Sequence, residues 1–119
     1  MITWNNLDKL TSYQELEKTE SVDLAAVMAG ENGAERVKNY SVPMAEGLAY
    51  NYAAKKVDDT VLAALEKLAE EAQLTEKFEA LYNGEVVNTG EKRLVLHHMT
   101  RGQLGDAVEA DGVDKRTFY

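Results

Sequence analysis

The hydrophobic pattern of this chain changes its period twice, and that change limits the folds open to it. Apolar residues recur at helical spacing before residue 40 and again after residue 58. Between them, "YSVPMAEGLAYNY" (residues 40–52) places apolar side chains at alternate positions around a turn-like Ala45-Glu46-Gly47. Alternation is typical of a strand, so this segment predicts a β-hairpin. Pro43 has no amide proton to donate, so its strand is expected at an edge.

Residues that start and stop helices mark the segments before the hairpin. Ser12 stands three positions before Glu15, which is the spacing of a capping box. Ser21 is placed to cap a second helix, and Gly30 is placed to end it. After the hairpin, an apolar stripe and two leading aspartates predict a helix over residues 58–73, and Asn83-Gly84 is expected to end the helix that follows. The predicted fold class is therefore mainly α with one small β-hairpin at about residues 40–53.

Charge and composition exclude several classes of partner. The 119 residues carry a net charge of −8, which disfavours nucleic acid and anionic membrane surfaces as partners. The chain contains no cysteine, so disulfides and thiolate chemistry are absent and a reducing compartment is favoured. No stretch is apolar over the length of a signal peptide or of a membrane span. We therefore expect a cytoplasmic protein with no nucleic-acid and no membrane partner, organised as a single helical segment over residues 1–119.

The densest group of polar functional residues lies in "NGEVVNTGEKRLVLHHMTRG", residues 83–102. If residues 91–101 form a helix, Arg93, His97 and Arg101 recur at four-residue spacing and share one face. Such a face can bind a phosphate or carboxylate, or it can tie the helix to carbonyls and to carboxylates such as Glu91. The structural interpretation is favoured because no nucleophile or general base is recognisably paired with these side chains. His97 and His98 are adjacent, a spacing that does not favour joint binding of one metal ion.

Other polar groups give weaker signals. The carboxylate pairs Asp58-Asp59 and Glu70-Glu71 fall on exposed helical positions, where charge is solvated. The tyrosines of the predicted hairpin are more typical of packing than of ligand stacking. From the residues alone, two function classes stay open: part of an enzyme, and a free-standing acidic helical module that binds another protein without enzymatic activity.

A resemblance adds to this interpretation. The pattern N-G-E-x-x-N-x-x-E-x-R-x-V-L-H-x-x-x-R resembles the amino-terminal region of the glucose-6-phosphate isomerase family. Its positions are occupied here by Asn83, Gly84, Glu85, Asn88, Glu91, Arg93, Val95, Leu96, His97 and Arg101. The order of predicted helices and hairpin before it, and "DGVDKRTFY" after it, are similar to that family as well.

The resemblance implies a larger α/β enzyme of the sugar-isomerase type, of which this chain is the amino-terminal segment. That family interconverts glucose 6-phosphate and fructose 6-phosphate in glycolysis and gluconeogenesis, without a cofactor, and the full-length enzyme is expected to be a homodimer. No catalytic, substrate-binding or metal-binding residue of the family matches a position here, so the catalytic sugar-isomerase domains are expected in the remainder of the parent chain. Glu91, Arg93, His97 and Arg101 are the structural candidates, expected to support that remainder. The isolated segment is expected to be inactive.

Overall fold

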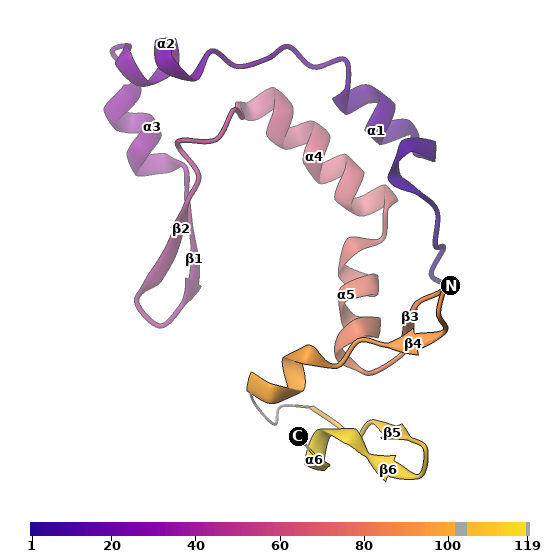
Figure 1. Cartoon of the computed structure of the whole chain (residues 1–119). Coiled ribbons are helices and arrows are strands. Elements are labelled where there is room, and N and C mark those ends of the chain that lie inside the picture. The colour runs from indigo at the N-terminus through magenta and orange to yellow at the C-terminus, as the bar shows by residue number, and fades with distance from the viewer. Residues whose placement is uncertain (102–104, 119) are drawn as a thin grey trace. The chain divides into compact units, whose positions relative to one another are not determined.

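The computed structural model describes residues 1–101 and 105–118, and within these ranges it contains short helices and three two-stranded antiparallel sheets (Figure 1). The chain divides into two compact units. The central unit comprises Thr11–Leu68, and the terminal unit comprises Met1–Leu10 together with Ala69–Tyr119. The chain is therefore rich in helix, as the hydrophobic periodicity predicts.

The central unit contains the predicted hairpin. Its elements in chain order are α1 (Thr11–Leu16), α2 (Leu24–Ala29), α3 (Gly33–Asn39), β1 (Ser41–Ala45), β2 (Leu48–Asn51) and most of α4 (Asp59–Glu71). β1 and β2 pair antiparallel with Val42 opposite Tyr50, which confirms the hairpin. Pro43 lies opposite Ala49, and each strand of this ribbon is an edge. Nearly every side chain on the two strands is exposed, so the ribbon is less packed than its pattern suggests.

Helix boundaries agree with the sequence signals at some ends and differ at others. Gly30 ends α2 as predicted, but the capping side chain is Asp23, whose carboxylate accepts from the Ala26 amide at 3.1 Å. The expectation that Ser21 caps this helix is therefore wrong, because a carboxylate adjacent to the first turn makes the same bond. Ser12 lies inside α1 and not at its cap. At α4 the prediction is confirmed, since Asp58 accepts from the Val61 amide at 2.8 Å.

Arg36 of α3 holds the segment that joins the hairpin to α4. Its Nε donates to the carbonyl of Ala53 at 2.9 Å, and one terminal nitrogen donates to the carbonyls of Lys55 and Val57 at 2.9 and 2.8 Å. The guanidinium also lies over the Tyr40 ring, 4.3 Å from its centroid. A planar fork with several donors can reach three carbonyls of one connector, which a point charge cannot do.

We expect Arg36→Ala to destabilise the connector by about 2–3 kcal/mol, because hydrogen bonds from a charged donor are among the stronger ones. Amide hydrogen exchange over residues 53–57 measures the effect. Arg36→Lys keeps the charge but loses the fork, so it is expected to lose most of the same stability. Lys38→Ala, an exposed position on the same helix, is the matched control. Equal protection of the connector in Arg36→Ala and Lys38→Ala would contradict this role.

The terminal unit joins both ends of the chain. Its elements are η1 (Leu7–Lys9), α5 (Leu74–Tyr82), β3 (Val86–Asn88), β4 (Arg93–Leu94), η2 (His97–Arg101), β5 (Glu109–Ala110), β6 (Val113–Asp114) and α6 (Lys115–Phe118). Gln73 ties the first residues to this unit, since its side-chain oxygen accepts from the Thr3 amide at 2.8 Å and its nitrogen donates to the Met1 carbonyl at 3.3 Å. Lys77 lies over the Trp4 ring at 5.3 Å. Asn83 and Gly84 end α5, as predicted.

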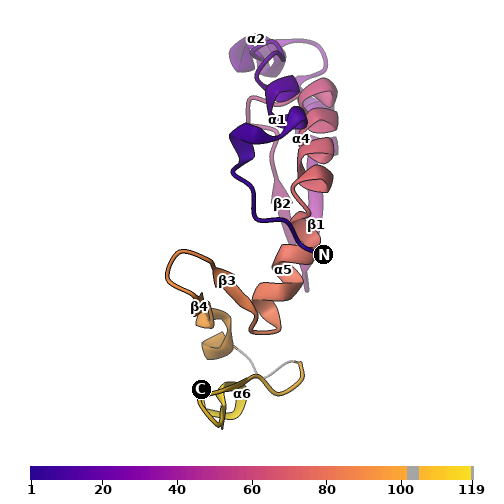
Figure 2. The same ribbon diagram turned by 90° about the vertical axis from the view of Figure 1, so that its right-hand side faces the viewer.

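The prediction of a single hairpin is wrong, because the terminal unit adds two more within the described residues. β3 pairs with β4, and β5 pairs with β6. In Figure 2 the β3–β4 hairpin projects from the end of α5. Each of these strands has two or three residues, which is too short to show an alternating pattern. The buried apolar residues of this unit include Met99, Ala80 and Val108. None of the helices in residues 1–101 and 105–118 has the length and apolar character needed to cross a bilayer.

Candidate functional site

The motif segment folds as a hairpin followed by a 3-10 helix, and not as one helix. Val86 pairs with Leu94, and the loop between the strands is closed by Asn88 and Glu91. The Asn88 side chain donates to the Glu91 carboxylate at 3.1 Å and accepts from its amide at 3.2 Å. β-branched valines followed by Asn-Thr-Gly favour a strand and a turn over a helix. A helix over residues 91–101 is therefore excluded. Asn88 and Glu91 of the motif instead bind each other across the β3–β4 loop.

The four predicted residues are divided between these two elements. Glu91 lies in the loop, where Asn88 holds its carboxylate. Arg93 lies on β4 with its side chain exposed, so the expectation that it shares a helix face with His97 is wrong. His97 and Arg101 both belong to η2. Their roles in a larger enzyme stay a prediction.

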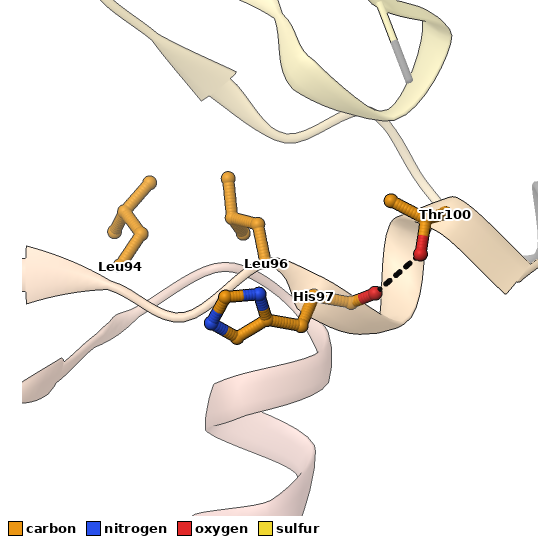
Figure 3. Close-up of a pocket in the computed structure, with 4 residues that line it drawn as sticks. All are labelled: Leu94, Leu96, His97 and Thr100. Atoms are coloured by element: carbon orange, nitrogen blue, oxygen red, sulfur yellow. Dashed lines mark hydrogen bonds between the residues drawn. The ribbon is translucent and has the colours of Figure 1, made fainter.

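His97 and Arg101 meet at an open hollow of about 560 Å³, whose lining also includes His98 and Thr100. A smaller adjoining hollow of about 260 Å³ is lined by Leu94, Leu96, His97 and Thr100 (Figure 3). Thr100 Oγ1 donates to the His97 carbonyl at 2.9 Å, which fixes the turn that carries both side chains. An imidazole and a guanidinium at one hollow can bind a carboxylate or a phosphate. In the described ranges, no three histidine, aspartate or glutamate side chains are grouped to hold a metal ion.

His98 of η2 belongs to a cluster with Tyr82 and Arg116 that the sequence pattern did not predict. The His98 ring stacks on the Tyr82 ring with centroids 4.8 Å apart, and its Nε2 lies 3.1 Å from the Tyr82 carbonyl. Because a carbonyl only accepts, Nε2 carries the proton of this bond. Nδ1 is buried and has no hydrogen-bond partner among the residues that the structure describes. Buried polar atoms are usually paired, so this nitrogen is an exception among the described residues.

Arg116 completes the cluster from the far end of the unit. Its side chain is only 4% exposed. Nε donates to the Asp106 carbonyl at 2.6 Å, a terminal nitrogen donates to the Tyr82 carbonyl at 3.0 Å, and the guanidinium lies 5.1 Å from the Tyr82 ring centroid. Gly105 has a φ of 107°, and a side chain there would lie 3.1 Å from the guanidinium carbon. No local signal predicts this arrangement, because Arg116 and Tyr82 are 34 residues apart.

Asp114 orders the β5–β6 hairpin and the start of α6, the helix that carries Arg116. Its carboxylate accepts from the Thr117 hydroxyl and from the amides of Val108 and Arg116, at 3.1 and 3.0 Å for the two amides. The hydrogen bond from the Thr117 hydroxyl is the largest effect and lowers the pKa of Asp114 from its ordinary value. Burial is the next largest and raises the pKa, and the amides of Val108, Arg116 and Thr117 each lower it further. These bonds form with the ionised carboxylate, which is the form they stabilise.

We therefore expect the β5–β6 hairpin to lose amide-exchange protection in acid. A folded pKa below the unfolded value stabilises the hairpin above the unfolded pKa, and this stability is lost as the pH falls through the folded pKa. Asp114→Asn is expected to remove that pH dependence. Asp111→Asn, at the turn of the same hairpin, is the matched control and should retain it. An Asp114→Asn hairpin that still loses protection in acid, as the unmodified chain does, would refute the assignment.

The comparisons with known proteins identify the class to which these elements belong. The family model described as phosphoglucose isomerase matches residues 51–117, which includes α4, α5 and the whole candidate site. The glucose-6-phosphate isomerase of Treponema denticola is 52% identical over 121 aligned positions, covering 98% of this chain. Those of Treponema pallidum and Borreliella burgdorferi are 45% and 35% identical, covering 99% and 100% of this chain.

The chain belongs to the phosphoglucose isomerase family. It spans about 23% of the length of the Treponema relatives that it matches and about 22% of the Borreliella relative.

Proposed function

We propose that these 119 residues are the amino-terminal part of a glucose-6-phosphate isomerase, and that the parent enzyme interconverts glucose 6-phosphate and fructose 6-phosphate without a cofactor. The observation that carries the proposal is the match of nearly the whole chain to relatives of that name, at up to 52% identity. The parent is then a larger α/β enzyme of the sugar-isomerase type, cytoplasmic and homodimeric.

The role of this segment in the parent is structural. Aldose–ketose isomerisation needs a base within about 2.6–3.2 Å of the proton that it moves, directly or through one water. The hollow at η2 is lined by His97, His98, Thr100 and Arg101, and none of these side chains is a carboxylate. The Glu91 carboxylate is held by Asn88 in the β3–β4 loop. We therefore assign Glu91, Arg93, His97 and Arg101 to support of the catalytic part, with the base and the phosphate-binding groups elsewhere in the polypeptide.

The parent polypeptide tests the proposed activity directly. The parent is purified in a chelator and without added nucleotide. It is then expected to convert fructose 6-phosphate to glucose 6-phosphate, and a glucose-6-phosphate dehydrogenase detects the product. His97→Ala and Arg101→Ala are each expected to lower the Tm of the parent while leaving its KM for fructose 6-phosphate nearly unchanged. A parent polypeptide without turnover would refute the activity, and a large rise of the KM in either variant would place that side chain at the substrate.

A further inference from the structure

An apolar groove runs along the central unit, away from the candidate site in sequence. It has a volume of about 520 Å³ and is lined from β1 by Val42, from β2 by Tyr50, from the connector by Lys55 and Val57, and from α4 by Leu62 and Leu65. Lys55 is the charged residue of this lining, and the others are aliphatic or aromatic. A concave surface of this composition fits apolar side chains.

The groove lies open although its lining is hydrophobic. Val42, Tyr50 and Leu65 are 45%, 46% and 39% exposed. Next to them on the ribbon, Met44 and Leu48 are 68% and 66% exposed. Monomeric soluble proteins rarely leave contiguous apolar patches of this kind uncovered, and such patches usually mark an interface. The buried hydrophobic residues described for the same unit are Val22 and Ala53, so the apolar surface on this face exceeds what the unit itself covers.

Two observations indicate the occupant. The chain spans about 23% of the length of its Treponema denticola relative, so most of a polypeptide of that length lies outside these residues. Lys55 is the charged residue of the lining, so an apolar segment that also carries a carboxylate complements the groove. A segment of the same polypeptide is also present at a high effective concentration, so a small apolar contact is sufficient to keep it bound in the groove.

We propose that this groove is the docking site for an apolar segment of the parent enzyme's own remaining chain, with a carboxylate of that segment facing Lys55. The proposal rests on the proposed function, because it takes the parent to be the longer isomerase. The side chains of Tyr50 and Leu65 are then covered in the parent. The exposed hairpin is stabilised by that contact, since an isolated two-stranded ribbon is marginal in water.

The test uses the parent polypeptide and a matched pair of substitutions on α4. Leu65→Asp places a charge in the groove and is expected to lower the Tm of the parent by at least about 5 °C. Ala63→Asp adds the same charge to the same helix at an exposed position outside the groove lining, and is expected to shift the Tm by no more than about 1 °C. Equal shifts in the two variants would overturn the proposal.

A second measurement needs no substitution, since a charge at Leu65 also disturbs the central unit itself. In hydroxyl-radical footprinting of the unmodified parent, Tyr50 and Leu65 are expected to react about tenfold more slowly than in the urea-unfolded polypeptide, because both are covered. Reaction within about twofold of the unfolded rate would overturn the proposal, since these side chains would then be as open as here. Protection that disappears on dilution to the monomer would also overturn it, because the occupant would be a second copy. Isomerase turnover of the same sample tests the proposed function separately.

Discussion

Gly84→Ala is expected to destabilise the terminal unit by about 2–5 kcal/mol, the sum of a backbone cost and a packing cost. Gly84 has a φ of 76° directly after α5, where an L side chain is strained. A Cβ there would also overlap Cγ1 of Val108 and lie 3.1 Å from its Cγ2. Val108 is 5% exposed and β-branched, so its rotation about χ1 is restricted and it cannot easily move aside.

Gly47→Ala separates the two costs. Gly47 in the β1–β2 turn has a φ of 72°, but nothing lies within 4 Å of a Cβ built there. It should therefore show only the backbone cost, about 1–2 kcal/mol. Urea unfolding of each variant measures the difference in unfolding free energy. Adding Val108→Ala to Gly84→Ala should recover part of the stability lost in Gly84→Ala, which a double-mutant cycle reports as a favourable coupling. Equal costs at Gly84 and Gly47 would show that the contact with Val108 is not formed.

Arg116→Ala is the second large effect that we expect, at about 3–4 kcal/mol of unfolding free energy. The substitution leaves the carbonyls of Tyr82 and Asp106 without the cationic donor that they share, and it removes the guanidinium that packs on the Tyr82 ring. Arg116→Lys is expected to restore little, because an ammonium cannot donate in two directions from one plane. Protection of the Lys115 amide, which donates to the Val108 carbonyl at 2.8 Å, provides a local measurement of the same loss.

Arg93→Ala is the matched control for this experiment. Arg93 is exposed on β4, and no hydrogen bond or ion pair of its side chain is found in the described part of the chain. In the isolated 119-residue chain, its removal should change the unfolding free energy by no more than about 0.5 kcal/mol, as at other surface positions. If Arg93→Ala and Arg116→Ala cost the same, the burial and bonding of Arg116 do not stabilise the unit.

The sequence predicts those parts of the fold whose signals are local. The β1–β2 hairpin was predictable because alternation extends over both strands and a glycine turn, and α4 because its apolar stripe continues for several turns. The segment after Gly84 was not, since strands of two or three residues carry no period that can be recognised. The four-residue spacing of His97 and Arg101 assumed an α-helix, but they lie on a 3-10 helix, where both line the same hollow.

The cluster of Tyr82, His98 and Arg116 could not be predicted for a different reason. Its bonds join residues separated by 16 and 34 positions, and each depends on backbone carbonyls that any residue carries. Sequence patterns report side-chain types, not the direction of carbonyls across a loop. The four structural candidates within the family motif, Glu91, Arg93, His97 and Arg101, were found for the opposite reason, through a resemblance, and their roles in the parent enzyme stay a prediction.

The most direct test of the central claim is a coupled isomerase assay on the purified 119-residue chain beside the parent polypeptide. Correct positioning of a substrate against catalytic groups can lower a barrier by about 7–11 kcal/mol, and a segment without the base and the phosphate site lacks that effect. We expect no turnover of fructose 6-phosphate above the buffer blank by the segment, and full turnover by the parent without added metal and without any nucleotide beyond that of the coupling dehydrogenase. Turnover by the segment that survives repurification would contradict the account, because the active site would then lie within these residues.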